Sequence, residues 1–324
     1  MRFKGTIGSP KQLSQLVAML GKLSDTCVVH MTPDTISFGV AASSNSGVHA
    51  CAELSTHSLF LDYRIESRAE NNRISFFVKI DNLSRALKSS SANANSKSLV
   101  KLTKKRGGAP TLTFEILLSD SAVQVQHDVP LRIVQDIEEL HAYNEPVYGD
   151  SAPSLSVVLP QPDIRGLRNV LERMKGFSDY VLLTARDKPL DGAERTAMLQ
   201  LQVERDNLVT ISTCYTKLER VDVAGTAEAP TSPGGGDAAT ASQRQRQRQP
   251  LAVGGDGAEE VAEARVEIKK LYKCLQSVVV SDIKLHGGIV AILPDQALVL
   301  KVFLPSTVEN HDSHVVFYCP VILS

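Results

Sequence analysis

The stretch LSDTCVV, residues 23–29, returns in the second half of the chain as FSDYVLL, residues 177–183. Each copy has a Ser-Asp pair directly before an apolar run of strand length. The pair at 24–25 matches the pair at 178–179 at an offset of 154 positions. Recurrence of the same turn and strand predicts an internal duplication.

Two further anchors extend the match. Ile80 begins an apolar i, i+3, i+7 pattern that Ile268 repeats at an offset of 188, and Pro130 matches Pro320 at an offset of 190. The offset grows by 34 between the first anchor and the second, which a single insertion would mostly explain. Residues 224–260 are rich in Gly, Ala, Pro and polar residues, so we expect a disordered insertion there.

The arrangement of predicted elements is the same in both halves. Each half has a strand, a helix, several strands, a second helix and further strands. The helices are expected near residues 10–22 and 81–92 in the first half, and at 162–175 and 269–278 in the second. This pattern predicts sheets built from antiparallel neighbours and four helices in equivalent places.

The polar faces of these four helices carry eleven basic residues and few acidic ones. The basic residues are Lys11, Lys22, Arg85, Lys88, Arg165, Arg168, Arg173, Lys175, Lys269, Lys270 and Lys273. If the helices share one layer, their charges form one surface, and such a surface favours a polyanion because Lys and Arg neutralise phosphates without reading base sequence. For any single residue, a solvated charge is an equally good interpretation.

Composition limits the class of protein. The 324 residues suggest two domains, and the net charge of −1 excludes a uniformly basic nucleic-acid binder but not a basic patch. No apolar run approaches the ~20 residues that span a bilayer, and the first residues lack a secretion signal, so we expect an intracellular protein without a membrane segment. The five cysteines include no CxxC pair, which argues against a disulfide framework and the usual zinc spacing.

Four motifs occur in order at 69–74, 83–88, 100–105 and 127–134: AENNRI, LSRALK, VKLTKK and HDVPLRIV. With the element order, they resemble the Hus subunit family of the DNA-damage checkpoint clamp, or 9-1-1 clamp, which has the PCNA-like sliding-clamp fold. The resemblance covers nearly all of the chain outside the insertion.

The resemblance implies an α+β fold with two βαβββαβββ domains, sheets outside, and four helices lining the DNA-facing side. The domains would be residues 1–131 and 154–324, joined by an interdomain connecting loop at 132–153. The implied role is that of a non-catalytic, nuclear subunit without a cofactor. It would form a heterotrimer with two other clamp-type checkpoint subunits. A clamp loader would place the ring on duplex DNA, where it would serve checkpoint signalling and repair enzymes.

Two kinds of contact site follow from the resemblance. Ring closure would add strands across subunit edges at 121–127 and 208–214, with packing by Val123, Val125, Val209 and Ile211. The connecting loop would dock partners through Ile133, Ile137, Tyr143 and Val147, although these residues would equally well anchor the loop itself.

An enzyme is the main alternative. His311 and His314 have a spacing that would suit a metal, but a third ligand is missing and a polar turn is favoured. Ser98 and Lys101 match Ser-x-x-Lys in spelling only, since strand alternation points them to opposite faces. A second alternative keeps the fold but closes the ring from three copies of this chain, as a replication clamp.

Overall fold

The computed structural model describes residues 1–42, 47–92, 96–105, 107–118, 124–134, 136, 138–146, 153–188, 196–205, 208–221, 260–305 and 313–322. The expected insertion at 224–260 lies outside these ranges apart from Glu260, where a strand begins.

The first half contains nine strands and three α-helices among its described residues. They are β1 (Arg2–Ile7), α1 (Pro10–Leu20), β2 (Thr26–Met31), β3 (Thr35–Val40), β4 (His49–Ser55), α2 (Thr56–Leu59), β5 (Phe60–Glu66), β6 (Ile74–Lys79), α3 (Ile80–Ser91), β7 (Lys97–Lys104), β8 (Pro110–Leu117) and β9 (Gln124–Ile133). A short 3₁₀ helix, η1 (Glu70–Asn72), precedes β6, and another, η2 (Glu138–Leu140), follows β9.

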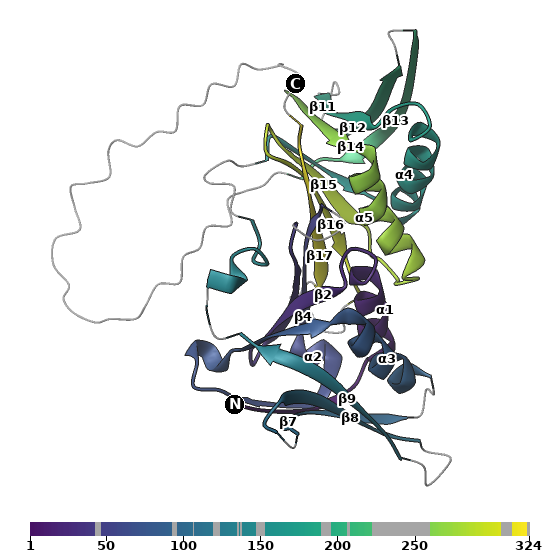
Figure 1. Cartoon of the computed structure of the whole chain (residues 1–324). Helices are drawn as coiled ribbons and strands as arrows, with labels where there is room; N and C mark the ends of the chain where they lie inside the picture. The colour runs from purple at the N-terminus through teal and green to yellow at the C-terminus, as the bar shows by residue number, and fades with distance from the viewer. Residues whose placement is uncertain are drawn as a thin grey trace, which may run out of the picture.

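The second half repeats this order. Its elements are β10 (Leu155–Leu159), α4 (Gln161–Met174), β11 (Tyr180–Lys188), β12 (Thr196–Arg205), β13 (Val209–Glu219), β14 (Glu260–Glu267), α5 (Ile268–Val280), β15 (Gly288–Leu293), β16 (Ala297–Phe303) and β17 (His314–Pro320). The expected α+β class is confirmed, with the four long helices on one side of the sheets (Figure 1).

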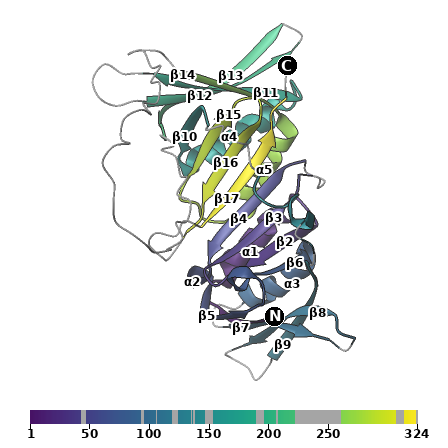
Figure 2. The same ribbon diagram turned by 90° about the vertical axis from the view of Figure 1, so that its left-hand side faces the viewer.

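One sheet joins the two halves. It has thirteen strands in the order β10-β15-β16-β17-β4-β3-β2-β6-β9-β8-β7-β1-β5, and a second sheet has the order β13-β12-β11-β14. The junction is the antiparallel pair β17 and β4, whose register runs from His314 opposite Glu53 to Tyr318 opposite His49. Figure 2 shows the strands continuing from one half into the other.

The register confirms the predicted duplication. Thr26 of β2 lies opposite Lys79 of β6, and Tyr180 of β11 lies opposite Glu267 of β14. Thr26 and Tyr180 are 154 positions apart, and Lys79 and Glu267 are 188 positions apart. These are the two offsets found in the sequence.

The Ser-Asp pair of each half has the same structural role. The Thr26 amide donates to the hydroxyl of Ser24 at 3.2 Å, and the equivalent amide of the second half donates to Ser178, also at 3.2 Å. The carbonyl of Asp25 accepts from the first amide of α3 at 2.9 Å, and that of Asp179 accepts from the first amide of α5 at 2.8 Å. The pair therefore fixes a strand start to a helix start, which explains its recurrence.

The helices pack through apolar stripes at helical spacing. Leu16, Leu87, Leu171 and Leu275, one from each long helix, are completely buried in the common core. Across the boundary between the halves, α1 contacts α5, and the side-chain amide of Gln12 donates to the carbonyl of Pro305 at 2.8 Å. The helix layer is thus continuous across both halves.

The number of strands between the helices exceeds the three in the expected formula. The first half has five there, β2 to β6, and the second has four, β11 to β14. Sequence patterns missed β5, whose side chains are mostly exposed or half-buried and so give little apolar signal. In the first half, β5 pairs with β1. At the equivalent place in the second half, an isolated β-bridge joins Arg220 to Val157 of β10.

Candidate nucleic-acid interface on the helix layer

Basic side chains recur at equivalent positions of the two halves. Lys11 of α1 matches Arg165 of α4 at the offset of 154, and Arg85 of α3 matches Lys273 of α5 at the offset of 188. Lys11, Arg85 and Arg165 are exposed and Lys273 is half-buried. Because the opposite stripe of each helix is buried against the sheets, both halves direct cations away from the sheets.

The structure places all eleven predicted basic residues on the long helices or directly after them. Eight are exposed, namely Lys11, Lys22, Arg85, Lys88, Arg165, Arg173, Lys175 and Lys269, and three are half-buried, namely Arg168, Lys270 and Lys273. Within the described part of the chain, no carboxylate lies at ion-pair distance from Lys11, Lys22, Arg85, Lys88, Arg165 or Arg173. These six charges are available to a ligand.

A compact cluster connects α4 and α5. The guanidinium of Arg168 donates to the hydroxyl of Tyr272 at 3.0 Å and lies 5.4 Å from the centre of its ring, while the Lys175 ammonium lies 4.9 Å from that centre. Glu172 accepts from Lys175 and lies 3.9 Å from Arg168. Lys175, and then the Tyr272 hydroxyl, hold the pKa of Glu172 below its usual range. Part of the charge of α4 is therefore neutralised within the helix layer.

A basic groove lies beside this cluster. It has a volume of about 750 Å³, and its lining includes four lysines and one carboxylate: Lys175, Lys269, Lys270, Lys273 and Glu267. Lys270 is held by Glu267 at 3.0 Å, and Lys269 by Asp179 at 3.3 Å. The excess of ammonium groups suits an anionic ligand such as a phosphate.

Where the structure describes them, the two predicted ring edges are strand edges without a partner strand on one side. Gln124–Pro130 of β9 pairs with β8 on one side, and β13 pairs with β12. Along their other edges the described residues contribute no ladder, apart from the bridge at Arg220. Val125 and Ile211 are half-buried and Val209 is exposed, whereas Val123 lies outside the described residues.

The predicted docking loop is anchored on the sheet. Leu140 is buried with Val28 and Phe77, and the ring of Tyr143 packs edge-on against Phe77 with 5.2 Å between ring centres. Ile133 belongs to β9, and Ile137 and Val147 lie outside the described residues. Sequence reasoning found Tyr143 but missed Leu140, which lies one helical turn before it. Partner docking by this loop stays a prediction.

The described residues offer little for catalysis. No group of three or more His, Cys, Asp or Glu side chains in this part of the chain could hold a metal ion, and His311 lies outside it. Burial, and then Glu145 and Glu53, raise the pKa of Cys51 to about 12, so this thiol stays protonated and is a poor nucleophile. None of the described helices is long and apolar enough to cross a membrane.

A family model described as Hus1-like protein matches residues 1–322. The chain belongs to this family. It is 31% identical over 179 residues to "Checkpoint protein hus1 homolog" of Dictyostelium discoideum, covering 55% of this chain and 64% of that protein. It is 32% identical over 209 residues to "Checkpoint protein HUS1" of Homo sapiens, covering 62% of this chain and 67% of that protein. The chain thus spans about two thirds of the length of these relatives.

Comparison with solved structures shows the fold of the chain. The chain is similar to PCNA from Thermococcus kodakaraensis, with a TM-score of 0.59, 16% identity, and coverage of 99% of this chain and 100% of that one. It is also similar to PCNA from Entamoeba histolytica, with a TM-score of 0.61, 9% identity and coverage of 99% of each chain. The resemblance to the Hus family and the PCNA-like fold are both confirmed.

Proposed function

We propose that this chain is a non-catalytic subunit of a ring-shaped sliding clamp that encircles duplex DNA. The observation that carries the proposal is the recurrence of cations at equivalent helix positions, Lys11 with Arg165 and Arg85 with Lys273, in a chain of net charge −1. The names of the relatives, which are checkpoint proteins, support a role as a platform for DNA-damage checkpoint signalling and repair.

The junction inside the molecule supplies a template for ring closure. Duplication makes β9 equivalent to β17, and β13 equivalent to β4. If the edges of two subunits pair in the same register as β17 and β4, Gln124–Asp128 of one subunit lies opposite Thr210–Cys214 of the next. The two edges lie at opposite ends of the molecule (Figure 1), as a head-to-tail ring requires.

The β9 edge is more polar than β17, its counterpart in the internal junction. Where β17 has the buried Phe317 and Tyr318, the equivalent positions of β9 have His127 and Asp128. A polar edge keeps an unassembled subunit soluble, and the main-chain ladder still provides binding when a partner is present. This difference supports a ring that opens for loading at its subunit contacts rather than within a chain.

Membership in the family supports a multi-subunit clamp, and the partners are part of the proposal. We assign the two edges to two other clamp-type checkpoint subunits, in a nuclear heterotrimer that a clamp loader opens and that repair enzymes use. Residues 1–131 and 154–324 would be its two clamp domains, and 132–153 the connecting loop. The helices would contact phosphates of either strand, so binding would be independent of base sequence.

Assembly is tested by native mass from light scattering on a sizing column, for the chain alone and co-expressed with the two candidate subunits. A one-to-one-to-one complex is expected. Thr210→Pro removes a donor from the β13 edge and is expected to release one partner, whereas Thr196→Pro on the paired strand β12 controls for general disruption. A stable homotrimer of the chain would instead support the replication-clamp alternative, and a monomer indifferent to both candidates would refute the assembly.

DNA contact is tested by the salt dependence of duplex binding by the assembled complex. Arg85→Glu with Lys273→Glu is expected to reduce the slope of log affinity against log salt by about 1.8, since each phosphate contact contributes ~0.9. Lys4→Glu with Arg64→Glu makes the same charge change on the exposed face of β1 and β5. Equal losses in both double variants would refute the helix layer as the DNA contact.

A further inference from the structure

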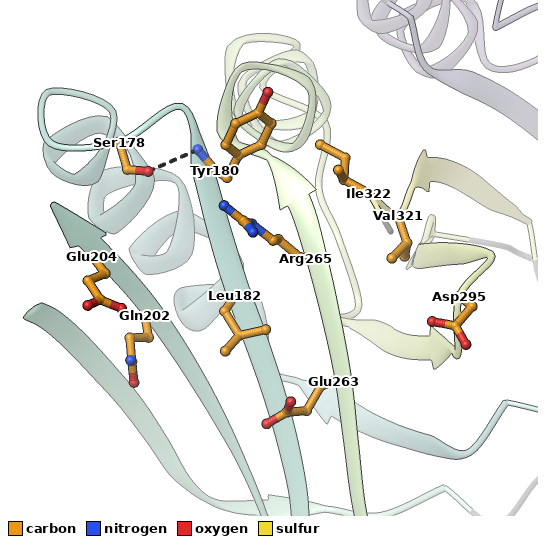
Figure 3. A pocket seen from close by; sticks show the side chains of 10 residues that line it. All are labelled: Ser178, Tyr180, Leu182, Gln202, Glu204, Glu263, Arg265, Asp295, Val321 and Ile322. Carbon is orange, nitrogen blue, oxygen red and sulfur yellow. Dashed lines mark hydrogen bonds between the residues drawn. The ribbon is translucent and has the colours of Figure 1, made fainter. Parts of the chain in front are cut away.

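The outer face of the second half contains a groove of about 440 Å³ that the helix layer does not touch. Figure 3 shows its lining, in which Tyr180 and Leu182 of β11 lie beside Arg265 and Glu263 of β14, with Ile322 at one end. Neighbouring side chains of β11, such as Val181, point the other way into the core. The groove therefore opens on the side of the sheet opposite the helices.

The equivalent face of the first half is covered by the chain itself. Duplication matches Leu182 with Val28 and Arg265 with Phe77. Val28 is fully buried and Phe77 nearly so, because Leu140 and Tyr143 of the connecting loop pack over them. In the second half, by contrast, Leu182 is half-buried and no described segment crosses the groove beyond Val321 and Ile322.

The chemistry of the uncovered face differs from that of the covered one. Where the first half has Ala41, Ser75 and Phe77, the second half has Glu204, Glu263 and Arg265. A face of this kind would not accept the apolar anchors of the connecting loop alone, since its carboxylates would lose hydration without gaining a partner.

The charges of the groove favour a cationic ligand. Its lining has three carboxylates, Glu204, Glu263 and Asp295, against one guanidinium. That guanidinium, on Arg265, is placed 5.2 Å from the ring centre of Tyr180, so it is already directed at an aromatic face. Leu182, Tyr180 and Ile322 add an apolar floor beside the carboxylates.

We propose that this groove docks a short segment of a partner protein, in which a lysine or arginine lies next to an apolar or aromatic anchor. The anchor packs on Leu182 and Ile322, and the cation pairs with Glu204 or Glu263, which lie on either side of Leu182. The segment binds on the face away from the helix layer, so bound DNA and a docked partner do not compete. The proposal depends on neither the ring nor DNA binding.

The test uses a displayed library of random twelve-residue peptides selected on the full chain. Selection on Glu204→Lys with Glu263→Lys is run in parallel, and Glu66→Lys with Glu70→Lys, on exposed residues of the first half, is the charge-matched control. Enriched sequences are expected to pair Lys or Arg with Leu, Phe, Tyr or Trp. They should bind the groove variant at least tenfold more weakly and the control variant equally well.

A charge-swapped peptide makes the test specific. Replacing its basic residue with glutamate should abolish binding to the natural chain and restore it to the groove variant. Enriched peptides that are acidic, peptides that bind both variants equally, or no enrichment would each overturn the proposal. So would a self-associating chain that becomes monomeric in the groove variant, because the occupant would then be a second copy.

Discussion

Gly39 of β3 lies directly beneath the connecting loop, and its lack of a side chain is required there. A Cβ at this position would lie 2.5 Å from the carbonyl oxygen of Tyr143 and 3.3 Å from its Cβ. Its φ is not in the left-handed region, so Gly39→Ala would not strain the strand itself. The substitution therefore tests one contact, the seat of the loop on the sheet.

The expected cost follows from what the loop buries. Leu140 is 3% exposed, and exposing a buried leucine costs ~2 kcal/mol, while losing the Tyr143–Phe77 ring pair costs ~1 kcal/mol. Complete detachment of the loop from the sheet thus costs about 3 kcal/mol. A smaller displacement of the loop would cost the ~1–3 kcal/mol that is typical of overpacking. We expect about 2 kcal/mol, which lowers local protection about 30-fold.

Hydrogen exchange of the segment 138–146 measures this opening directly. The amides of Tyr143 and Asn144 donate to the carbonyl of Leu140 at 2.8 and 2.9 Å, so both report on the anchored turn. The matched control is Gly166→Ala in α4, where a Cβ would lie 3.5 Å from the Tyr215 hydroxyl and should stabilise the helix by ~0.5–1 kcal/mol. Unchanged protection in Gly39→Ala, or the same loss in both variants, would refute the reasoning.

Two further predictions concern buried charge. Arg220 pairs with the nearly buried Asp187 and lies 2.8 Å from Glu260, so Arg220→Met should lower the free energy of unfolding by ~3 kcal/mol, whereas Glu260→Gln should cost under ~1 kcal/mol in a urea titration. Equal losses would contradict this assignment. Burial, and then Arg73, lower the pKa of His30 to about 4, below its unfolded value of ~6.5, so its contribution to stability is lost as pH falls from about 6.5 toward 4. With the partial exposure of the ring discounted, this loss is ~1 kcal/mol between pH 7 and 5. It should disappear in His30→Gln and persist in His57→Gln, and an unchanged pH slope in His30→Gln would refute it.

Periodicity and duplication made most of the fold predictable. Each half repeats the same anchors, so a weak strand in one copy is supported by its counterpart in the other. The exception is β5, which has no complete counterpart among the described residues of the second half and has an exposed, weakly patterned sequence. A strand whose side chains pack little carries little apolar signal, whatever its role in the sheet.

The candidate site was predictable in composition but not in its pairings. The ion pair of Lys175 with Glu172 follows from helical spacing, since the two residues are three apart. The pairing of Lys269 with Asp179 does not, because the two meet only where β11 and β14 align. Leu140 was likewise missed, because the sequence alone does not distinguish it from the other apolar residues of the loop. Its role depends on Val28 and Phe77 of the sheet beneath it.

The two halves keep cations at two pairs of equivalent helix positions, and they differ on the outer face. Lys11 and Arg165 are equivalent on the helix layer, where a polyanion would contact both halves. On the outer face, Gly39 has Gln202 as its equivalent, and the glycine is required only in the half that the loop covers. Because both faces belong to the same duplicated strands and helices, their difference reflects what each face contacts rather than what the fold requires. Gln202→Gly should therefore leave the unfolding of the second half nearly unchanged, apart from the ~0.5–1 kcal/mol that a glycine costs in a strand.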